Sequence, residues 1–301
     1  MNKIQHEVDN NICGRRFFEM IYTVCIKTNN NNVLDYLLNN FKEIQLEKKY
    51  YSKNSFKLYD NIIFHYIGNS SMAFYSNISK ILANCIINFY ESNLIKKIIS
   101  LNYFYFSNVE KKAIYKKCIL NLASPELLVL KHDFIYKAIN NYFLSNKQMV
   151  LDGFVNFRIK EYMNLLDEQV DLSVDNFLVE REYIEFVNLL KIYINSKHSL
   201  TNLIHLIYIN GETILLDEKK QLIDASSFKL EAKYLSDITF SSNDYALNTL
   251  LTLLPKKLKV HLDCEKDEFI NTLELIFENK IIFCNNCSLC KELRNTKFIK
   301  T

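Results

Sequence analysis

The chain has 301 residues, of which 49% are hydrophobic and 24% charged, with four Gly, two Pro and no Trp. This composition excludes collagen-like and wholly disordered proteins, and the length is enough for two domains. The 37 basic and 34 acidic side chains leave a formal net charge of +3, which by itself indicates neither nucleic-acid nor membrane binding. We therefore expect no nucleic-acid partner and no membrane partner.

Residues 1–68 carry the pattern of a small α/β unit. Residues 15–27 and 57–67 are rich in aromatic and β-branched side chains, which predicts two strands. Between them, apolar residues recur at helical spacing from Val33 to Ile44, which predicts a helix.

Residues 69–199 are expected to form a helical region. Ser124 followed by Pro125 is typical of a helix start, with serine as N-cap and proline in the first turn. The last helix is predicted over 152–194, with 171–173 as a candidate break. Its buried face is expected to be an apolar stripe at helical spacing: Ile159, Tyr162, Leu166, Val170, Val174, Phe177, Ile184, Val187 and Ile194.

The opposite face of this helix is mostly acidic and is a candidate binding surface for another protein. Its candidate contact residues are Glu180, Arg181, Glu182 and Glu185. Arg181 and Glu185 also have the spacing of an ordinary i, i+4 ion pair, so a plainly solvated surface is the alternative interpretation.

Residues 200–301 are expected to form a C-terminal mixed α/β domain, which makes the whole chain α+β. Strands are predicted at 203–209, 213–216, 222–225, 258–262 and 281–283, with helices at 243–254 and 267–277. Asn210-Gly211 between two apolar runs is a strong hairpin signal. The last strand–helix–strand segment should have parallel strands.

The eight cysteines are expected to be free thiols. The N-terminus has no signal-peptide pattern, and no run approaches the ~18 apolar residues of a membrane span, so we expect a cytoplasmic protein in a reducing compartment. Three of the cysteines form the cluster Cys284-x-x-Cys287-x-x-Cys290. This spacing lets successive sulfurs converge on one centre, as in zinc and iron–sulfur sites.

A metal site of this kind needs a fourth ligand from elsewhere in the chain. Cys264 is the preferred candidate, because parallel strands would bring the ends of 258–262 and 281–283 to the same edge of the sheet. His261 is the second candidate. Zinc would be structural, whereas a [4Fe–4S] cluster would indicate redox or sensor chemistry.

Other sequence features are weaker indicators of function. His65 and His205 lie in apolar strand-like runs, where core histidines bonded to backbone are the usual finding. We find no phosphate-binding loop, nucleophile elbow or zinc-protease motif, which favours a non-enzymatic protein. A third interpretation is nucleic-acid binding through a zinc-knuckle-like end, whose basic residues are Lys291, Arg294, Lys297 and Lys300.

Several motifs, taken in order, resemble one known family. They are the segments 175–191, 215–218 and 248–258 and the closing Ile276-Phe277 with the three cysteines. Over roughly 152–290 the chain resembles the YtxC family of endospore-forming Firmicutes. The resemblance implies an association with sporulation, but it implies no specific biochemical activity.

Overall fold

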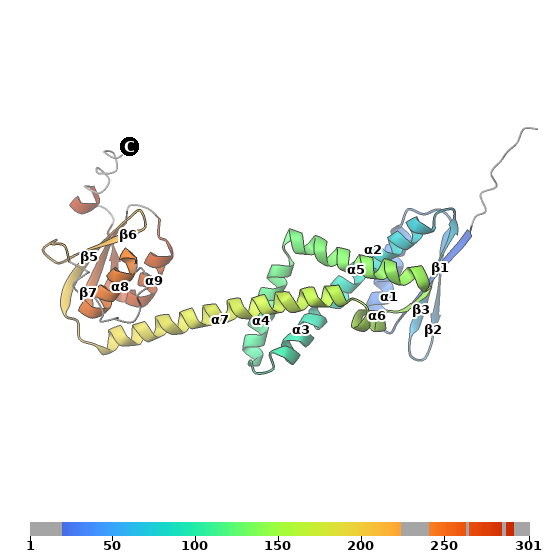
Figure 1. The fold of residues 1–301 in the computed structure, drawn as a ribbon, viewed down its shortest axis with the longest axis horizontal. Helices are drawn as coiled ribbons and strands as arrows, with labels where there is room; N and C mark the ends of the chain where they lie inside the picture. Colours follow the sequence, from blue (N-terminus) through green and yellow to red (C-terminus); the bar gives the residue numbers. More distant parts are fainter. Residues whose placement is uncertain (1–19, 224–240, 263–264, 285–286, 292–301) are drawn as a thin grey trace, which may run out of the picture. The chain divides into compact units, whose positions relative to one another are not determined.

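The computed structural model describes residues 20–223, 241–262, 265–284 and 287–291. Its contacts divide the chain into two compact units, Met1–Phe177 and Leu178–Thr301. Each unit combines one four-stranded sheet with helices, so the fold class is α+β, as the sequence predicts (Figure 1). The domain boundaries expected at residues 68 and 199 stay predictions.

The sheet of unit 1 has the strand order β2-β3-β1-β4. β1 pairs antiparallel with β3 and parallel with β4. The strands are β1 (Met20–Thr28), β2 (Lys49–Ser55), β3 (Asp60–Gly68) and β4 (Gln148–Val150). The strands predicted at 15–27 and 57–67 are confirmed over 20–27 and 60–67, and 15–19 lie outside the described residues. The strands β2 and β4 were not predicted.

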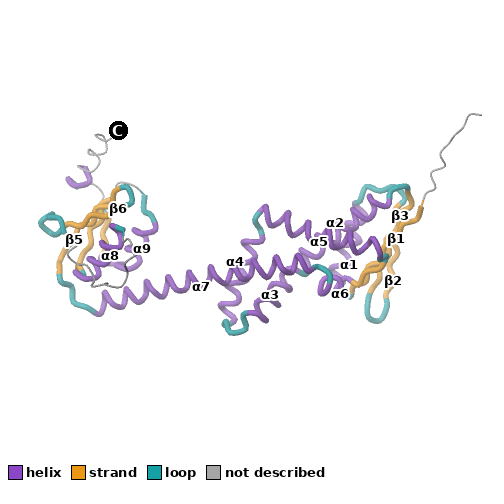
Figure 2. Tube along the Cα trace, viewed as in Figure 1, coloured by secondary structure: helices purple, strands orange, loops and turns teal. Residues whose placement is uncertain are grey.

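Six helices of unit 1 pack beside this sheet and on one another (Figures 1 and 2). They are α1 (Asn31–Glu43), α2 (Ser71–Phe89), α3 (Glu91–Asn102), α4 (Asn108–Leu122), α5 (Pro125–Ser145) and α6 (Leu151–Phe157). The predicted start of α5 at Pro125 is confirmed. Ser124 occupies the N-cap, but its side chain makes no capping hydrogen bond.

A buried polar group joins three helices inside unit 1. Lys131 Nζ of α5 lies 3.0 Å from Glu91 Oε1 of α3, and the Tyr162 hydroxyl donates to Glu91 Oε2 at 2.7 Å. All three residues are buried. Because each charge faces a partner, the helices can enclose it without leaving an unpaired ion in the core.

The helix α7 (Lys160–Ser196) differs from the helix predicted over 152–194. The break falls at Arg158, between α6 and α7, and the helix continues through 171–173. Ser173 is helical, and its hydroxyl donates to the carbonyl of Gln169, four residues earlier, at 2.6 Å, a bond compatible with helical backbone. The prediction that Ile184 is buried is wrong, since it is 57% exposed, whereas Val187 and Ile194 are buried.

Unit 2 contains a sheet with the strand order β6-β5-β7-β8. Its elements are β5 (Thr201–Ile209), β6 (Glu212–Leu216), α8 (Ser242–Leu253), β7 (Pro255–Leu262), α9 (Glu268–Phe277), the 3-10 turn η2 (Glu278–Lys280) and β8 (Ile281–Phe283). The predicted hairpin is confirmed, with positive φ angles of 54° at Asn210 and 85° at Gly211. Of the strand expected at 222–225, Leu222 makes an isolated bridge to Leu216, and 224–225 lie outside the described residues.

The core of unit 2 fixes the edge where β7 and β8 end. β7 pairs parallel with both β5 and β8, so the predicted parallel arrangement of the last two strands is confirmed. Leu206, Val260 and Leu273 belong to one buried cluster that joins these strands to α8 and α9. This packing holds the C-terminal ends of β7 and β8 side by side.

Candidate metal centre

Four potential metal ligands come together where β7 and β8 end. The ligand atoms of His261, Cys284, Cys287 and Cys290 all lie within 4.8 Å of one another. His261 Nδ1 is 3.3 Å from Cys290 Sγ and 3.4 Å from Cys287 Sγ, and the two sulfurs are 3.8 Å apart. One imidazole nitrogen and three sulfurs therefore converge on one point.

The parallel pairing of the last two strands builds this group. Val260 pairs with Phe283, and the backbone N–H of Cys284 donates to the Val260 carbonyl at 2.8 Å. This bond places Cys284 beside His261, the residue that follows Val260. A helical turn from residue 288, in which the Lys291 N–H donates to the Cys287 carbonyl at 3.1 Å, then brings Cys290 back to the group.

A second buried histidine orients His261. The Nε2 atom of His261 lies 3.0 Å from Nδ1 of His205 on β5, and the two rings are stacked with centroids 5.3 Å apart. If Nδ1 of His261 binds a metal, the neutral ring carries its proton on Nε2 and donates it to His205. Histidine ligands in proteins commonly have such a partner, which fixes the tautomer and the ring orientation.

The electrostatic environment suits metal binding by His261. Burial lowers its pKa to about 4, and the neighbouring His205 and Lys259 lower it in the same direction. His261 is fully buried and neutral at pH 7, which is the form that binds a metal.

The thiols of the group differ in their surroundings. Burial raises the pKa of Cys290. Burial acts in the same direction on Cys287, but hydrogen bonds from the Cys290 backbone and the Cys284 side chain bring its pKa below the usual value. A low pKa favours the thiolate, the form in which a cysteine binds metals.

The distances in the group fit a single tetrahedral ion. Zinc–sulfur bonds of about 2.3 Å and zinc–nitrogen bonds of about 2.0 Å place two sulfurs about 3.8 Å apart, and a sulfur and a nitrogen about 3.5 Å apart. The separations of 3.8, 3.3 and 3.4 Å among His261, Cys287 and Cys290 agree with these values, and the Cys284 sulfur lies within 4.8 Å of the other three ligand atoms. The residues therefore fit a mononuclear site with a Cys₃His donor set.

Comparison with known proteins places the chain in a family. The model of the YtxC-like family matches residues 76–282. The chain belongs to the YtxC-like family. It is 20% identical over 154 residues to the uncharacterized protein YtxC of Bacillus subtilis (strain 168), an alignment that covers 46% of this chain and 54% of that protein. The chain thus spans about half the length of this relative, and no solved structure matches it.

The family match includes part of the metal group. His205 and His261 lie inside the matched range of the YtxC-like model, and the match ends at Ile282, just before the three cysteines. The match begins within α2, so it extends further toward the N-terminus than the resemblance seen over 152–290.

The structure answers part of the question about the fourth ligand. It brings His261, the second candidate, together with the three cysteines. Cys264, the preferred candidate, lies outside the described residues. His205 was interpreted as a core histidine bonded to backbone, but its partner is the His261 ring. A signal for this contact exists in the sequence, because His205 and His261 lie on adjacent strands with the same side-chain parity.

The remaining candidate residues of this YtxC-like chain lie apart from the metal group. His65 on β3 shares a hydrogen bond of 3.1 Å with the Thr23 hydroxyl rather than with backbone. Glu180, Glu182 and Glu185 are exposed on α7, and Arg181 Nε lies 3.7 Å from Glu185 Oε1. The basic residues expected to bind nucleic acid lie outside the described residues, except for Lys291.

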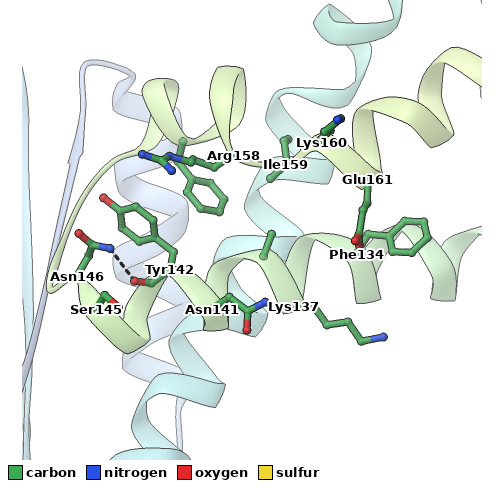
Figure 3. Close-up of a pocket in the computed structure, with 12 residues that line it drawn as sticks. Phe134, Lys137, Asn141, Tyr142, Ser145, Asn146, Arg158, Ile159, Lys160 and Glu161 are labelled. Carbon is green, nitrogen blue, oxygen red and sulfur yellow. Dashed lines mark hydrogen bonds between the residues drawn. The ribbon is translucent and has the colours of Figure 1, made fainter.

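One of the hollows of unit 1 lies beside α5 and α6 (Figure 3). Its volume is about 410 Å³, and its lining includes Tyr142, Arg158 and Glu161. The amide of Asn146 donates to the Tyr142 carbonyl at 3.0 Å on its rim. The lining residues include no histidine and no cysteine. Among the described helices, none has the length and apolar character needed to cross a membrane.

Proposed function

We propose that His261, Cys284, Cys287 and Cys290 hold one zinc ion with a structural role, and that this YtxC-like chain is a non-enzymatic interaction protein. The proposal rests on the convergence of four ligand atoms within 4.8 Å. A structural zinc site has four protein ligands and leaves no coordination position for a substrate. The four protein ligands agree with this class of site rather than with a catalytic one.

The ion would connect the last described residues to the edge of the sheet. β8 has only three residues, and its pairing with β7 ends at Phe283. Residues 287–291 follow this short strand, and Cys287 and Cys290 within them reach the group through their sulfurs. Bonds from zinc to these sulfurs and to His261 would hold the segment against β7.

The compactness of the group favours zinc over a [4Fe–4S] cluster. Each cysteine of such a cluster binds a different iron, so its sulfurs surround a body of eight iron and sulfide atoms. Here Cys287 Sγ and Cys290 Sγ are 3.8 Å apart, which suits two ligands of the same ion. A redox or sensor function would need these sulfurs to move apart.

We further propose that the chain acts in the cytoplasm during sporulation by binding another protein through α7. The resemblance to the YtxC family supports the setting. The exposed carboxylates of Glu180, Glu182 and Glu185 support a basic surface on the partner. Apolar Val179 and Ile184, which are 66% and 57% exposed on the same helical segment, would add contact area.

The metal is tested on protein purified without oxygen, by elemental analysis and absorption spectroscopy. The test variant is Cys284→Ser/Cys287→Ser/Cys290→Ser. The control Cys25→Ala/Cys85→Ala/Cys118→Ala removes three buried thiols of unit 1. One colourless zinc per chain, lost in the test variant and kept in the control, supports the proposal. A brown protein that contains iron would show an iron–sulfur cluster in place of zinc. Protein with neither metal would refute the site.

The partner is tested by reversing charge on α7. Glu182→Lys/Glu185→Lys should lower spore yield while leaving thermal unfolding unchanged. Glu43→Lys/Glu47→Lys makes the same charge change at exposed positions of unit 1 and should leave spore yield at the wild-type level. Equal spore yields in the two variants would contradict the proposed surface.

A further inference from the structure

The tip of the hairpin formed by α3 and α4 exposes a group of large apolar side chains. Leu101, Phe104, Tyr105 and Val109 are 65%, 73%, 63% and 79% exposed. They lie in or beside the turn that joins the two helices, which Figure 2 draws in teal at the end of the hairpin. Leu101 lines a small hollow of about 240 Å³, whereas Phe104, Tyr105 and Val109 line none of the hollows described in this unit.

The turn is held in place by contacts that leave two of its rings in solvent. Phe106 is buried, with its ring centroid 5.7 Å from that of Phe177 on α7, and the Tyr105 ring packs 4.7 Å from Phe106. The Tyr103 hydroxyl donates to Asp171 Oδ1 at 2.7 Å. These anchors prevent Phe104 and Tyr105 from folding back onto the helices, so their exposure is built into the fold.

Positive charge is concentrated around this tip. The hairpin, residues 91–122, contains six lysines and two acids, Glu91 and Glu110, which gives 6 − 2 = +4. The lysines are Lys96, Lys97, Lys111, Lys112, Lys116 and Lys117. Because the whole chain carries +3, the remainder carries 3 − 4 = −1, so the net positive charge of the chain comes from this hairpin.

Two acids of α7 lie next to the hairpin. Asp171 holds Tyr103, and Asp167 lines a hollow of about 240 Å³ together with Lys97. Lys112 and Lys116 are exposed, and they lie on α4, the helix that follows the turn. Their positive charge is thus available to an external ligand.

We propose that the α3–α4 tip binds the surface of membranes that contain anionic phospholipids. Aromatic and aliphatic side chains on a protruding turn can enter the headgroup region, where a Tyr ring buries its apolar body while its hydroxyl stays in water, and where Phe, Leu and Val bury apolar area. Lysines beside the turn would bind lipid phosphates. This surface would overturn the expectation of no membrane partner, which rested on net charge and on the lack of a spanning segment. The tip belongs to unit 1 and the metal group to unit 2, so either proposal can fail without the other.

The absence of tryptophan from the chain allows a direct test. Phe104→Trp in the full-length protein introduces a single indole, excited at wavelengths where the tyrosines do not absorb. Vesicles of phosphatidylcholine mixed with phosphatidylglycerol should shift its emission to shorter wavelength, and vesicles of phosphatidylcholine alone should not. Phe56→Trp is the matched control, since Phe56 is 62% exposed on the β2–β3 hairpin, and its emission should not change.

Co-sedimentation with the same vesicles tests the charge. Each lysine near an anionic surface strengthens binding by roughly fivefold, so Lys112→Gln/Lys116→Gln should weaken it by roughly 30-fold. Lys256→Gln/Lys257→Gln removes the same charge from exposed positions of unit 2 and should leave binding unchanged. An unshifted Phe104→Trp emission, equal losses in the two lysine variants, or a shift produced by DNA and not by vesicles would each overturn the proposal.

Discussion

Replacement of His205 by leucine removes the acceptor that faces the ring N–H of His261. The Nε2 atom of His261 lies 3.0 Å from Nδ1 of His205, and both residues are buried. In the leucine variant this donor would have no partner in an apolar pocket, and the ring would lose the contact that fixes its orientation. We therefore expect the His205→Leu protein to bind zinc more weakly although it keeps all four ligands.

The size of the effect follows from the position of His205 one shell outside the ligands. Loss of such a partner typically lowers metal affinity 10- to 100-fold, which corresponds to about 1.4–2.7 kcal/mol. The cost of leaving one buried donor unpaired, about 1–3 kcal/mol, has the same magnitude. His205→Gln keeps an acceptor oxygen on a side chain of similar reach and should retain most of the affinity.

The assay is competition for zinc between the protein and a chromophoric chelator at pH 7. His65→Leu is the control, because His65 bonds Thr23 in the other unit and should leave zinc affinity unchanged. Circular dichroism of each metal-free variant reports whether the fold is intact. Unchanged zinc affinity in folded His205→Leu protein would refute the role of His205, and equal losses in the leucine and glutamine variants would show that packing, not the hydrogen bond, is responsible.

Two further predictions concern thiol reactivity and the buried ion pair. Burial raises the pKa of Cys85 to about 12, whereas Cys287 is partly exposed and has a lowered pKa. In metal-free protein at pH 8, iodoacetamide should therefore alkylate Cys287 faster than Cys85. Zinc should slow the alkylation of Cys287. Peptide mass spectrometry measures both sites, and equal rates at the two thiols would contradict the prediction. Lys131→Met leaves Glu91 without its buried partner and should destabilise the protein by about 3–5 kcal/mol in urea unfolding. Glu91→Gln/Lys131→Met should recover much of that loss, and a double variant no more stable than Lys131→Met would refute the pairing argument.

The sequence was informative where local chemistry determines local structure. Asn210-Gly211 predicted the hairpin because both residues tolerate the positive φ that a tight turn requires. The parallel pairing of β7 and β8 followed from an α-helix lying between two short apolar runs. The cysteine spacing then placed three sulfurs at the edge where these strands end.

Sequence reasoning was less informative where tertiary contacts decide. β4 has three residues, too few for a periodic pattern, and it forms because β1 offers a free edge. The break expected at 171–173 is absent, and packing accompanies the continuous helix there, since Val170, Ser173 and Val174 are buried and Asp171 accepts a hydrogen bond from the Tyr103 hydroxyl. The shared edge of the two parallel strands left two candidates for the fourth ligand, and the orientation of His261 depends on His205, which is 56 positions away in the chain.

The ligands His261 and Cys290 are 29 positions apart, and α9 lies in the segment between them. A bound ion would therefore close a loop around this helix. By the chain-entropy relation used for covalent crosslinks, closing a loop of this length raises the free energy of the unfolded chain by about 3.6 kcal/mol. The bound ion would therefore raise the free energy needed to unfold the segment that contains α9. Hydrogen exchange of the amides of α9 would thus report the state of an ion that the helix itself does not touch.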